Sequence, residues 1–273
     1  MSDHQTPPAH PSATWRARWL DALANARRDR QPIPADPNLS TCSVQDACQI
    51  QAENIHRTLA DIGGGIIGFK LGGTTEPILA RLNLDSPFVG PIFSSRTYES
   101  PAVLHRDDFI ACIIEAEIGV RIGRDLGEGD GVPTRDDLLA AIDSVFPAIE
   151  IADSRLRDWS QMGAAAIISD NGYAGAWIRG PEVKQWRDID LVGLPITLRK
   201  DDEIIREGSG AVVLGDPLRA LGMLVSSLRQ RGEILRAGTL VSTGSCIAPF
   251  PSPAGGRFVA DFGALGSVTM DLK

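Results

Sequence analysis

One stretch of the chain constrains its fold more than any other, an apolar run with two glutamates two positions apart. Residues 109–122 are dense in β-branched side chains, which predicts a strand. Alternate side chains of a strand share a face, so Glu115 and Glu117 point the same way. Burying either carboxylate unpaired would cost several kcal/mol or force it to take up a proton, so the pattern points to a cation between them.

The carboxylates of this stretch indicate a divalent-metal site. Hard oxygen ligands suit Mg²⁺ or Mn²⁺, although a solvated pair on an exposed sheet face stays open from this stretch alone. A third acid, Glu150, lies between isoleucines in the predicted strand Ala148–Ala152. Three carboxylates that converge in one sheet would hold a metal with room for a bidentate ligand.

A lysine stands in a second apolar run. Residues 66–71 predict a strand, and a glycine-rich turn follows at residues 72–75. Lys70 is therefore either an edge residue whose amine reaches water or a buried amine that holds a substrate anion. Residues 240–245 predict another strand, whose small polar end would let backbone amides and a hydroxyl approach an anion; an ordinary tight turn is the alternative.

Two polar segments have open interpretations. Residues 167–172 predict a strand that ends in a turn, where Asp170 and Asn171 either make Asx-type bonds or touch substrate. Residues 154–159, Ser-Arg-Leu-Arg-Asp-Trp, form either a surface ion-pair turn or part of a pocket.

Charge, hydropathy and histidine content exclude several classes of function. The formal net charge of −8 argues against nucleic acid or an anionic membrane surface as the main partner. No apolar run is long enough to span a bilayer and the N-terminus is polar and proline-rich, so we expect a cytoplasmic protein. None of the four histidines lies in a convincing catalytic setting, which leaves acid–base work to carboxylates, lysine or metal-bound water.

Helix and turn signals divide the chain. We expect a disordered tail over residues 1–13, a helical cap over residues 14–65 and a larger body over residues 66–273. The cap holds two predicted helices, at 14–30 and from Ser43 to the glycines at 63–65. In the body, helices are predicted to begin near Pro77, at Thr134 (ending at Pro147) and at Asp216, with hairpins over 194–207 and 257–272.

Taken in order, these residues resemble the fumarylacetoacetase-fold hydratase/decarboxylase family. The resemblance implies an α+β fold, with a mixed β-roll or sandwich like the fumarylacetoacetase C-terminal domain behind an N-terminal helical region, usually assembled as a homo-oligomer. It covers nearly everything after the tail and rests on residues 44–47, 50–51, 68–72, 114–118, 147–150, 154–159, 170–171, 243–244 and 265–268.

The resemblance also implies site residues. It makes Glu115, Glu117 and Glu150 the ligands of a divalent metal, Mg²⁺ or Mn²⁺, and Lys70 the active-site lysine. Asp170 is a second catalytic candidate. The substrate-binding candidates are Gly72, Thr243, Gly244 and Ser245.

The implied activity is metal-dependent addition of water to a 2-hydroxy-2,4-dienoate, giving a 4-hydroxy-2-oxo acid in the degradation of ring compounds. This chain has Phe88 where comparable hydratases resemble Asp-x-Pro-Asp, so the second acid is replaced. The first alternative is a 4-oxalocrotonate-type 2-oxo acid decarboxylase, since one electron sink serves both reactions. An acylpyruvate-type C–C hydrolase and a non-catalytic partner subunit of a related hydratase or decarboxylase also remain open.

Overall fold

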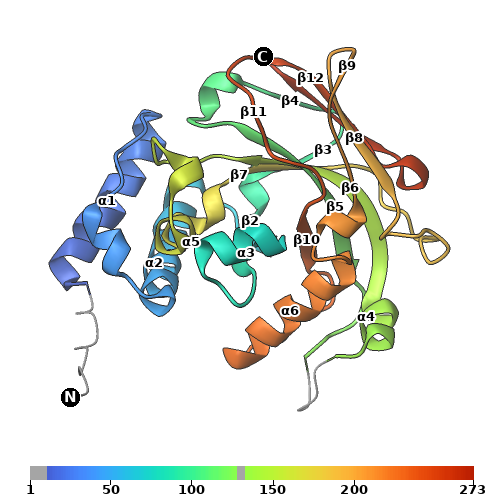
Figure 1. The fold of residues 1–273 in the computed structure, drawn as a ribbon, viewed down its shortest axis with the longest axis horizontal. Coiled ribbons are helices and arrows are strands. Elements are labelled where there is room, and N and C mark those ends of the chain that lie inside the picture. The colour runs from blue at the N-terminus through green and yellow to red at the C-terminus, as the bar shows by residue number, and fades with distance from the viewer. Residues whose placement is uncertain (1–10, 128–132) are drawn as a thin grey trace.

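The computed structural model describes residues 11–127 and 133–273, and it builds two curved sheets with helices around them (Figure 1). The α-helices are α1 (Ala13–Asp29), α2 (Val44–Ile62), α3 (Glu76–Leu82), α4 (Arg135–Ala141), α5 (Ala164–Ser169) and α6 (Pro217–Gln230). Short 3-10 helices lie at Pro37–Thr41, Ser94–Arg96, Arg106–Asp108, Trp159–Gln161, Asn171–Tyr173, Gly210–Val212 and Gly263–Leu265.

The strands fall into two mixed sheets within the described ranges. They are β1 (Ile66–Gly72), β2 (Phe88–Phe93), β3 (Thr97–Glu99), β4 (Ala102–Leu104), β5 (Ile113–Ile122), β6 (Ile142–Ala152), β7 (Ala174–Arg179), β8 (Pro195–Lys200), β9 (Glu203–Ser209), β10 (Leu240–Ser245), β11 (Phe250–Pro251), β12 (Gly256–Asp261) and β13 (Ser267–Leu272). The larger sheet has the order β2-β1-β10-β5-β6-β7-β3, with β11 also paired to β5, and the smaller has the order β4-β13-β12-β8-β9.

The main core lies on one face of the larger sheet. Alternation along β5 buries Ile114 and Ile118 in one hydrophobic cluster with Phe258 of the smaller sheet and Leu221 of α6. Strands β12 and β13 pack against β6, so the two sheets cover each other. The opposite face of β5 and β6 carries the three glutamates between apolar residues such as Ile113 and Phe146.

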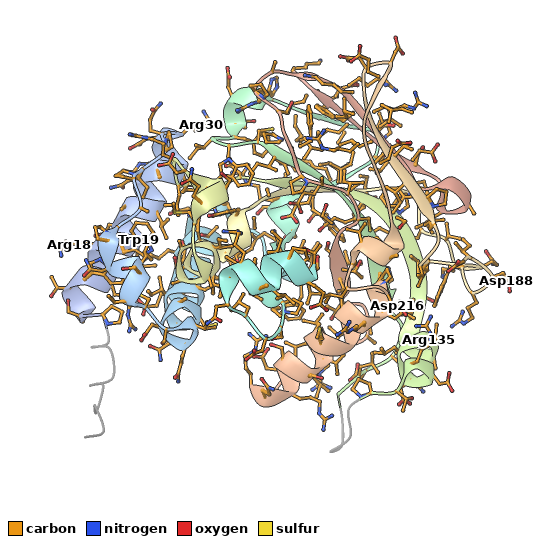
Figure 2. All side chains as sticks on the ribbon, in the orientation of Figure 1. Arg18, Trp19, Arg30, Arg135, Asp188 and Asp216 are labelled. Carbon is orange, nitrogen blue, oxygen red and sulfur yellow. The ribbon has the colours of Figure 1, made fainter. Side chains whose placement is uncertain are left out.

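The N-terminal helices pack beside the larger sheet (Figure 1). Helix α2 begins after Ser43, the predicted cap, and the structure adds a reciprocal capping box between Ser43 and Asp46. The indole of Trp19 on α1, labelled in Figure 2, donates to the hydroxyl of Ser169 at the end of α5. Helix α2 also packs on α5, so the two predicted cap helices join the body through α5.

Several local predictions are confirmed. Thr134 and Asp137 cap α4 reciprocally, and Asp216 caps α6 by accepting from the amide of Leu218. Arg135 pairs with Asp216, which joins the starts of these two helices (Figure 2). The predicted hairpins are present as β8–β9 and β12–β13.

The predicted helix from Thr134 to Pro147 is wrong in its second half. Helix α4 ends at Ala141, and β6 begins at Ile142 and runs through Pro147 to Ala152. Pro147 is tolerated inside the strand because its side of the ladder needs only its carbonyl, which accepts from the amide of Gly180 at 2.8 Å. Reading the proline as a helix stop therefore shortened the predicted strand.

The predicted strand at residues 167–169 is also wrong. These residues end helix α5, which packs between α2 and the 3-10 helix that follows it. A short apolar run suits either a buried strand or a buried helix, and the tertiary contact with α2 decides here. The strand predicted from Phe109 begins only at Ile113. Strands β2, β3 and β4 lie between the helix predicted near Pro77 and that strand, where no element was predicted.

Helix α1 begins at the end of the predicted N-terminal tail. Most of the predicted tail, residues 1–10, lies outside the described residues, and Ser12 already caps α1 by accepting from the amide of Trp15 at 3.2 Å. The division into a cap at 14–65 and a body at 66–273 stays a prediction. Within the part of the chain that the structure describes, no helix has the length and apolarity needed to cross a membrane.

Candidate functional site

Strand register brings the three glutamates together. In the antiparallel pair β5–β6, Glu115 lies directly opposite Glu150, and Glu117 lies opposite Ala148 on the same face. One carboxylate oxygen from each glutamate lies within 4.8 Å of the others. We call Glu115, Glu117 and Glu150 the acidic cluster.

The acidic cluster is buried, so the solvated-face interpretation is wrong. Glu117 is 0% exposed and Glu150 is 3% exposed, whereas Glu115 is partly exposed. One oxygen of Glu117, Oε2, accepts from the hydroxyl of Ser242 on β10. The other, Oε1, is buried with no hydrogen-bond partner among the residues that the structure describes.

Lys70 enters the cluster from β1. Its side chain is buried, so the alternative in which the amine reaches bulk water is wrong. The Nζ atom donates to Glu150 Oε1 and, at 2.9 Å, to the carbonyl oxygen of Gly172. The buried lysine thus stands beside the acids that the sequence singled out.

The cluster has too much negative charge for its single lysine. Burial first, and then repulsion from Glu150, raises the pKa of Glu115 to about 7. Burial, with repulsion from Glu150 and Glu115, raises the pKa of Glu117 well above its ordinary range. Burial alone would lower the pKa of Lys70, but the three carboxylates outweigh it and the pKa is raised.

The residues fit a divalent cation. Oxygen ligands lie about 2.0 to 2.6 Å from Mg²⁺ or Ca²⁺, so ligands on opposite sides of one ion are about 4 to 5 Å apart, close to the spread seen here. The unpartnered Oε1 of Glu117 is the kind of buried polar atom that a cation satisfies. The donor set, three carboxylates, is the chemistry that hard cations prefer.

The acidic cluster borders a large cavity. This cavity has a volume of about 580 Å³, and Lys70, Glu115 and Glu150 form one part of its wall. Most of the remaining wall is apolar, and Arg81 of α3 also lines it. An elongated small molecule with one anionic end suits such a space.

Phe88 shapes the cavity beside Lys70. A Cβ atom on Gly72 would lie 2.2 Å from Cζ of the Phe88 ring, so the glycine makes room for the phenylalanine. Both residues line the cavity. The position that carries Phe88 therefore faces the site, and no carboxylate projects from it.

The other substrate-binding candidates divide into two groups. Gly72 and Ser245 line the cavity, and the Ser245 hydroxyl donates to the carbonyl of Ile247 at 3.0 Å. Thr243 is buried and donates to the carbonyl of Ile118 at 3.0 Å, away from the cavity wall. Gly244, with φ of +109°, allows close approach of Thr74, because a Cβ there would lie 2.2 Å from Thr74 Oγ1.

Asp170 is not brought to the cavity wall. It is fully buried and pairs with Arg155, whose Nε donates to Oδ1 at 2.6 Å and whose backbone amide donates to Oδ2 at 3.0 Å. The first half of segment 154–159 is therefore buried, with Arg155 2% exposed, whereas Arg157 and Asp158 lie on the surface. This pair fixes the loop before Gly172, the residue whose carbonyl holds Lys70.

Sequence reasoning missed three contributors. Ser242 binds Glu117, Gly172 binds Lys70 through its carbonyl, and Arg81 gives the cavity a second cation. A hydroxyl in the middle of the apolar strand at 240–245 was a usable signal for Ser242. Gly172 acts through its backbone carbonyl, and Arg81 reaches the cavity from the end of helix α3. A pattern of side chains in the sequence reveals neither.

We expect the metal-free protein to lose stability as the pH rises from about 4.5 to about 7. In that interval the folded protein holds protons on Glu115 and Glu117 that the unfolded chain has released, so the free energy of unfolding falls with pH. Lys70 does not reverse this, because its raised pKa matters only in alkaline solution. Denaturant unfolding in EDTA between about pH 5 and about pH 8 measures it.

The same series with Glu117→Gln is the control, because one of the two protons no longer responds to pH. The variant should show a flatter dependence and a higher stability near neutral pH than the natural chain. A dependence that is unchanged in Glu117→Gln would contradict the assignment of the effect to the acidic cluster.

Comparisons with known proteins agree with this geometry. A family model described as fumarylacetoacetate (FAA) hydrolase C-terminal matches residues 80–270. The chain is 30% identical over 259 residues to a 2-keto-4-pentenoate hydratase of Paraburkholderia xenovorans (strain LB400), covering 94% of this chain and 95% of that one. It is 32% identical over 225 residues to a 4-oxalocrotonate decarboxylase of Pseudomonas putida, covering 82% and 83%.

A solved structure is similar over almost the whole chain. It is that of 4-oxalocrotonate decarboxylase from Pseudomonas putida G7 complexed with magnesium and adipate, with a TM-score of 0.87 and 28% identity, and the match covers 96% of this chain and 99% of that chain. The same enzyme complexed with calcium and acetate gives a TM-score of 0.86. The predicted α+β architecture behind an N-terminal helical region is thereby confirmed.

Proposed function

The chain belongs to the fumarylacetoacetate hydrolase C-terminal family, and on that premise we propose that it is a divalent-metal-dependent lyase that hydrates a 2-hydroxy-2,4-dienoate. The product would be a 4-hydroxy-2-oxo acid. The observation that carries the proposal is the buried acidic cluster with an unpartnered Glu117 oxygen, open to a cavity that also holds Lys70. Relatives named as dienoate hydratases support the substrate class.

In this proposal Glu115, Glu117 and Glu150 hold the divalent cation. The bound cation supplies a Lewis acid for the carboxylate and 2-oxygen of the substrate. Ser242 orients Glu117 through its hydroxyl, so that the other carboxylate oxygen faces the ion. The main-chain pairing of β5 with β6 keeps Glu115 and Glu150 at a fixed separation during turnover.

Lys70 is proposed to move the proton. In the metal-free protein the three carboxylates raise the pKa of Lys70, so its side chain is an ammonium. A divalent cation on the same carboxylates would lower that pKa toward the range of an effective proton donor. Hydration requires the dienol to gain a proton at a carbon remote from the carboxylate and then to take water across the remaining double bond. The cavity is largely apolar beyond Lys70, so it would bury the carbon chain and limit the water that reaches it.

The test is the ultraviolet absorbance of a 2-hydroxypenta-2,4-dienoate solution after removal of metal with EDTA and after addition of Mg²⁺ or Mn²⁺. Metal-dependent loss of the dienol absorbance supports the hydratase. Equal turnover with and without metal would overturn the proposal, because the acidic cluster would then have no role in the reaction.

Decarboxylation of a 2-oxo dicarboxylic acid is the second candidate. It is favoured by Phe88, which puts an apolar ring at the wall where an acid could help activate water, and by Arg81, which could bind a second carboxylate. The solved structure of a 4-oxalocrotonate decarboxylase with adipate supports the same reading. Metal-dependent release of CO₂ from 4-oxalocrotonate, without dienol consumption, would replace hydration by this activity.

Arg81→Gln should distinguish substrates with one carboxylate from those with two. If Arg81 binds a distal carboxylate, the variant should raise KM for the dicarboxylate about tenfold or more while changing KM for the monocarboxylic dienoate by less than about twofold. Steady-state kinetics with both substrates measure this. Arg219→Gln on the surface of α6 is the matched control, and an equal change for both substrates would contradict a carboxylate contact.

The proposal also covers the metal ion, the location in the cell and the assembly of the protein. We propose Mg²⁺ or Mn²⁺ as the physiological ion. Both ions bind carboxylate oxygens and keep coordination positions open for the substrate. We further propose a cytoplasmic homo-oligomer that can associate with a related hydratase or decarboxylase. Metal content of the purified protein and its mass in solution test these points.

A further inference from the structure

A second cavity lies between helices α1 and α2 and the segments that follow β6. A small pocket next to it is lined by Arg96 together with Lys70 and Glu150. The second cavity has a volume of about 390 Å³, and none of its lining residues also lines the larger cavity. Three aspartates line it against a larger set of cations. These are Arg27, Arg28, Arg30, Arg96 and Arg155.

Two of these arginines, Arg27 and Arg96, have no ion pair with an acidic side chain within the described residues. The other three are paired: Arg28 with Asp29 at 3.4 Å, Arg30 with Asp108 at 3.0 Å and Arg155 with Asp170 at 2.6 Å. Asp153 accepts from the backbone amides of Ile110 and Ala111 at 2.7 and 2.8 Å, so one of its oxygens is already engaged. The third aspartate, Asp61, is exposed on α2 at the edge of the cavity.

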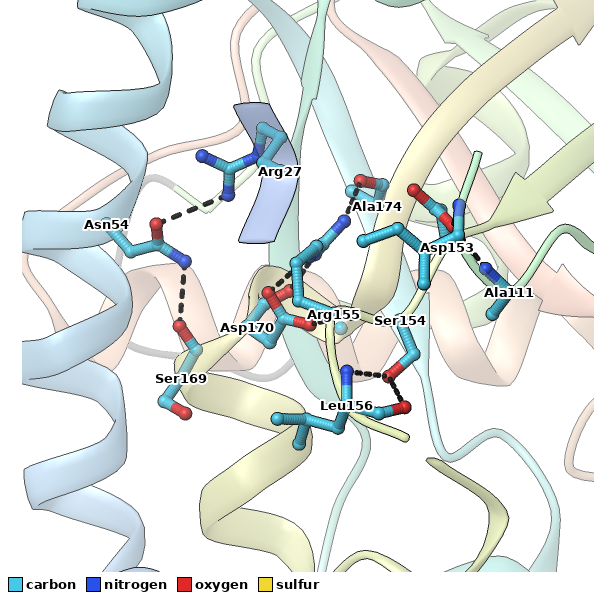
Figure 3. A network of polar contacts seen from close by, with 12 residues as sticks. Arg27, Asn54, Ala111, Asp153, Ser154, Arg155, Leu156, Ser169, Asp170 and Ala174 are labelled. Atoms are coloured by element: carbon cyan, nitrogen blue, oxygen red, sulfur yellow. Dashed lines mark hydrogen bonds and ion pairs between the residues drawn. The ribbon is translucent and has the colours of Figure 1, made fainter. Parts of the chain in front are cut away.

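Arg27 has unused hydrogen-bonding capacity inside the protein. Its Nη1 atom is buried and has no hydrogen-bond partner among the described residues, and its Nη2 atom makes only a long contact of 3.4 Å with Asn54 (Figure 3). Burial, followed by repulsion from Arg155, lowers the pKa of Arg27 to about 10. A buried guanidinium in this state gains from an added anion.

Arg96 is a second cationic side chain at the cavity. It is half-buried, and within residues 11–127 and 133–273 the structure pairs it with no acidic side chain. Arg155 also lines the cavity, and its charge is close enough to repel Arg27. Its Nε, Nη1 and Nη2 atoms already donate to Asp170 and to the carbonyl of Ala174, so it contributes charge more than free donors. The three arginines come from α1, from the turn after β2 and from the loop after β6, so the fold and not a local sequence run assembles them.

We propose that this cavity is a binding site for a compact oxyanion, a carboxylate or a phosphate, held by Arg27 and Arg96 in front of Arg155. Guanidinium groups bind both kinds of oxyanion in a bidentate manner, and the cavity volume lies at the lower end for small-molecule sites. The site does not depend on the proposed lyase reaction. It lies behind segment 171–175, whose Gly172 carbonyl accepts from Lys70 on the other side.

Titration calorimetry on the metal-free chain of 273 residues tests the proposal, with inorganic phosphate in one series and succinate in the other. EDTA removes any ion that could attract these anions to the acidic cluster. We expect saturable binding of at least one of the two anions, weakened about tenfold or more in Arg27→Gln and in Arg96→Gln. Phosphate binding alone would identify a phosphate site, and succinate binding alone a carboxylate site.

Arg57→Gln is the matched control, since Arg57 lies on exposed α2 surface and pairs with Asp21. Its affinity should equal that of the natural chain. Thermal melting of each variant separates lost binding from lost fold, and Arg27→Lys, which keeps the charge, should retain part of the affinity if Arg27→Gln is destabilised. Absence of binding to the natural chain would overturn the proposal. So would an anion affinity in Arg27→Gln and Arg96→Gln that equals the affinity of the natural chain.

Discussion

Glu117→Gln should lower divalent-metal affinity at least about 100-fold and abolish metal-dependent turnover at ordinary metal concentrations. Changes beside a metal ligand typically cost 10- to 100-fold, roughly, so loss of a ligand charge should cost no less. Glu117 is also fully buried, which means that water cannot easily replace it. Calorimetric titration with Mg²⁺ and Mn²⁺, followed by the dienol assay, measures both effects.

This substitution has a built-in check on folding. Removing a carboxylate whose pKa is raised by burial should stabilise the metal-free protein near neutral pH, although the same change removes metal binding. A misfolded variant would lose both properties together. Glu203→Gln on exposed strand β9 is the control, and it should leave metal affinity unchanged. Full metal affinity in Glu117→Gln would contradict the proposed ligand set.

Lys70→Met should reduce kcat about 100-fold to 10,000-fold, because it removes the group proposed to donate the proton. Metal affinity should not weaken, since Lys70 is a cation that competes with the metal for Glu150. The combination of a large loss in kcat and unchanged or tighter metal binding is the expected signature. Single-turnover kinetics at saturating metal separate the chemical step from binding.

The metal-free Lys70→Met protein should be less stable than the natural chain. Without the ammonium, three carboxylates remain buried together with no cation. Saturating metal should restore most of the stability. Lys184→Met, at an exposed lysine, is the control. If the loss of kcat were matched by an equal loss of metal affinity, Lys70 would be a support for the acidic cluster and not a proton donor.

The arginine-lined cavity can be tested separately from Glu117. Glu117 does not line it, so Glu117→Gln should bind phosphate or succinate as the natural chain does. Lys70 lines a small adjacent pocket together with Arg96, so Lys70→Met is not a control for this site. Segment 171–175 contributes residues to the walls of both cavities. Coupling between the arginine-lined cavity and the acidic cluster would therefore be measured as a change in kcat when the anion binds. The binding experiment itself stands without that coupling.

Local sequence signals predicted much of the secondary structure. The cap of α2 at Ser43 and the start of α6 after Asp216 involve residues within one helical turn, so their signals are complete in the sequence. The strand period likewise put Glu115 and Glu117 on one face. The errors at Pro147 and at residues 167–169 came from segments whose state depends on neighbours far along the chain.

The residue pattern alone shows which polar side chains stand in apolar strands: two glutamates in β5, one in β6 and a lysine in β1. That Glu115 faces Glu150, that Lys70 turns inward to them and that Asp170 pairs with Arg155 becomes visible only in the folded chain. A strand's period fixes the faces of its own side chains, whereas register between distant strands depends on packing of the whole sheet. A one-residue slip in that register would send Glu150 to the opposite face.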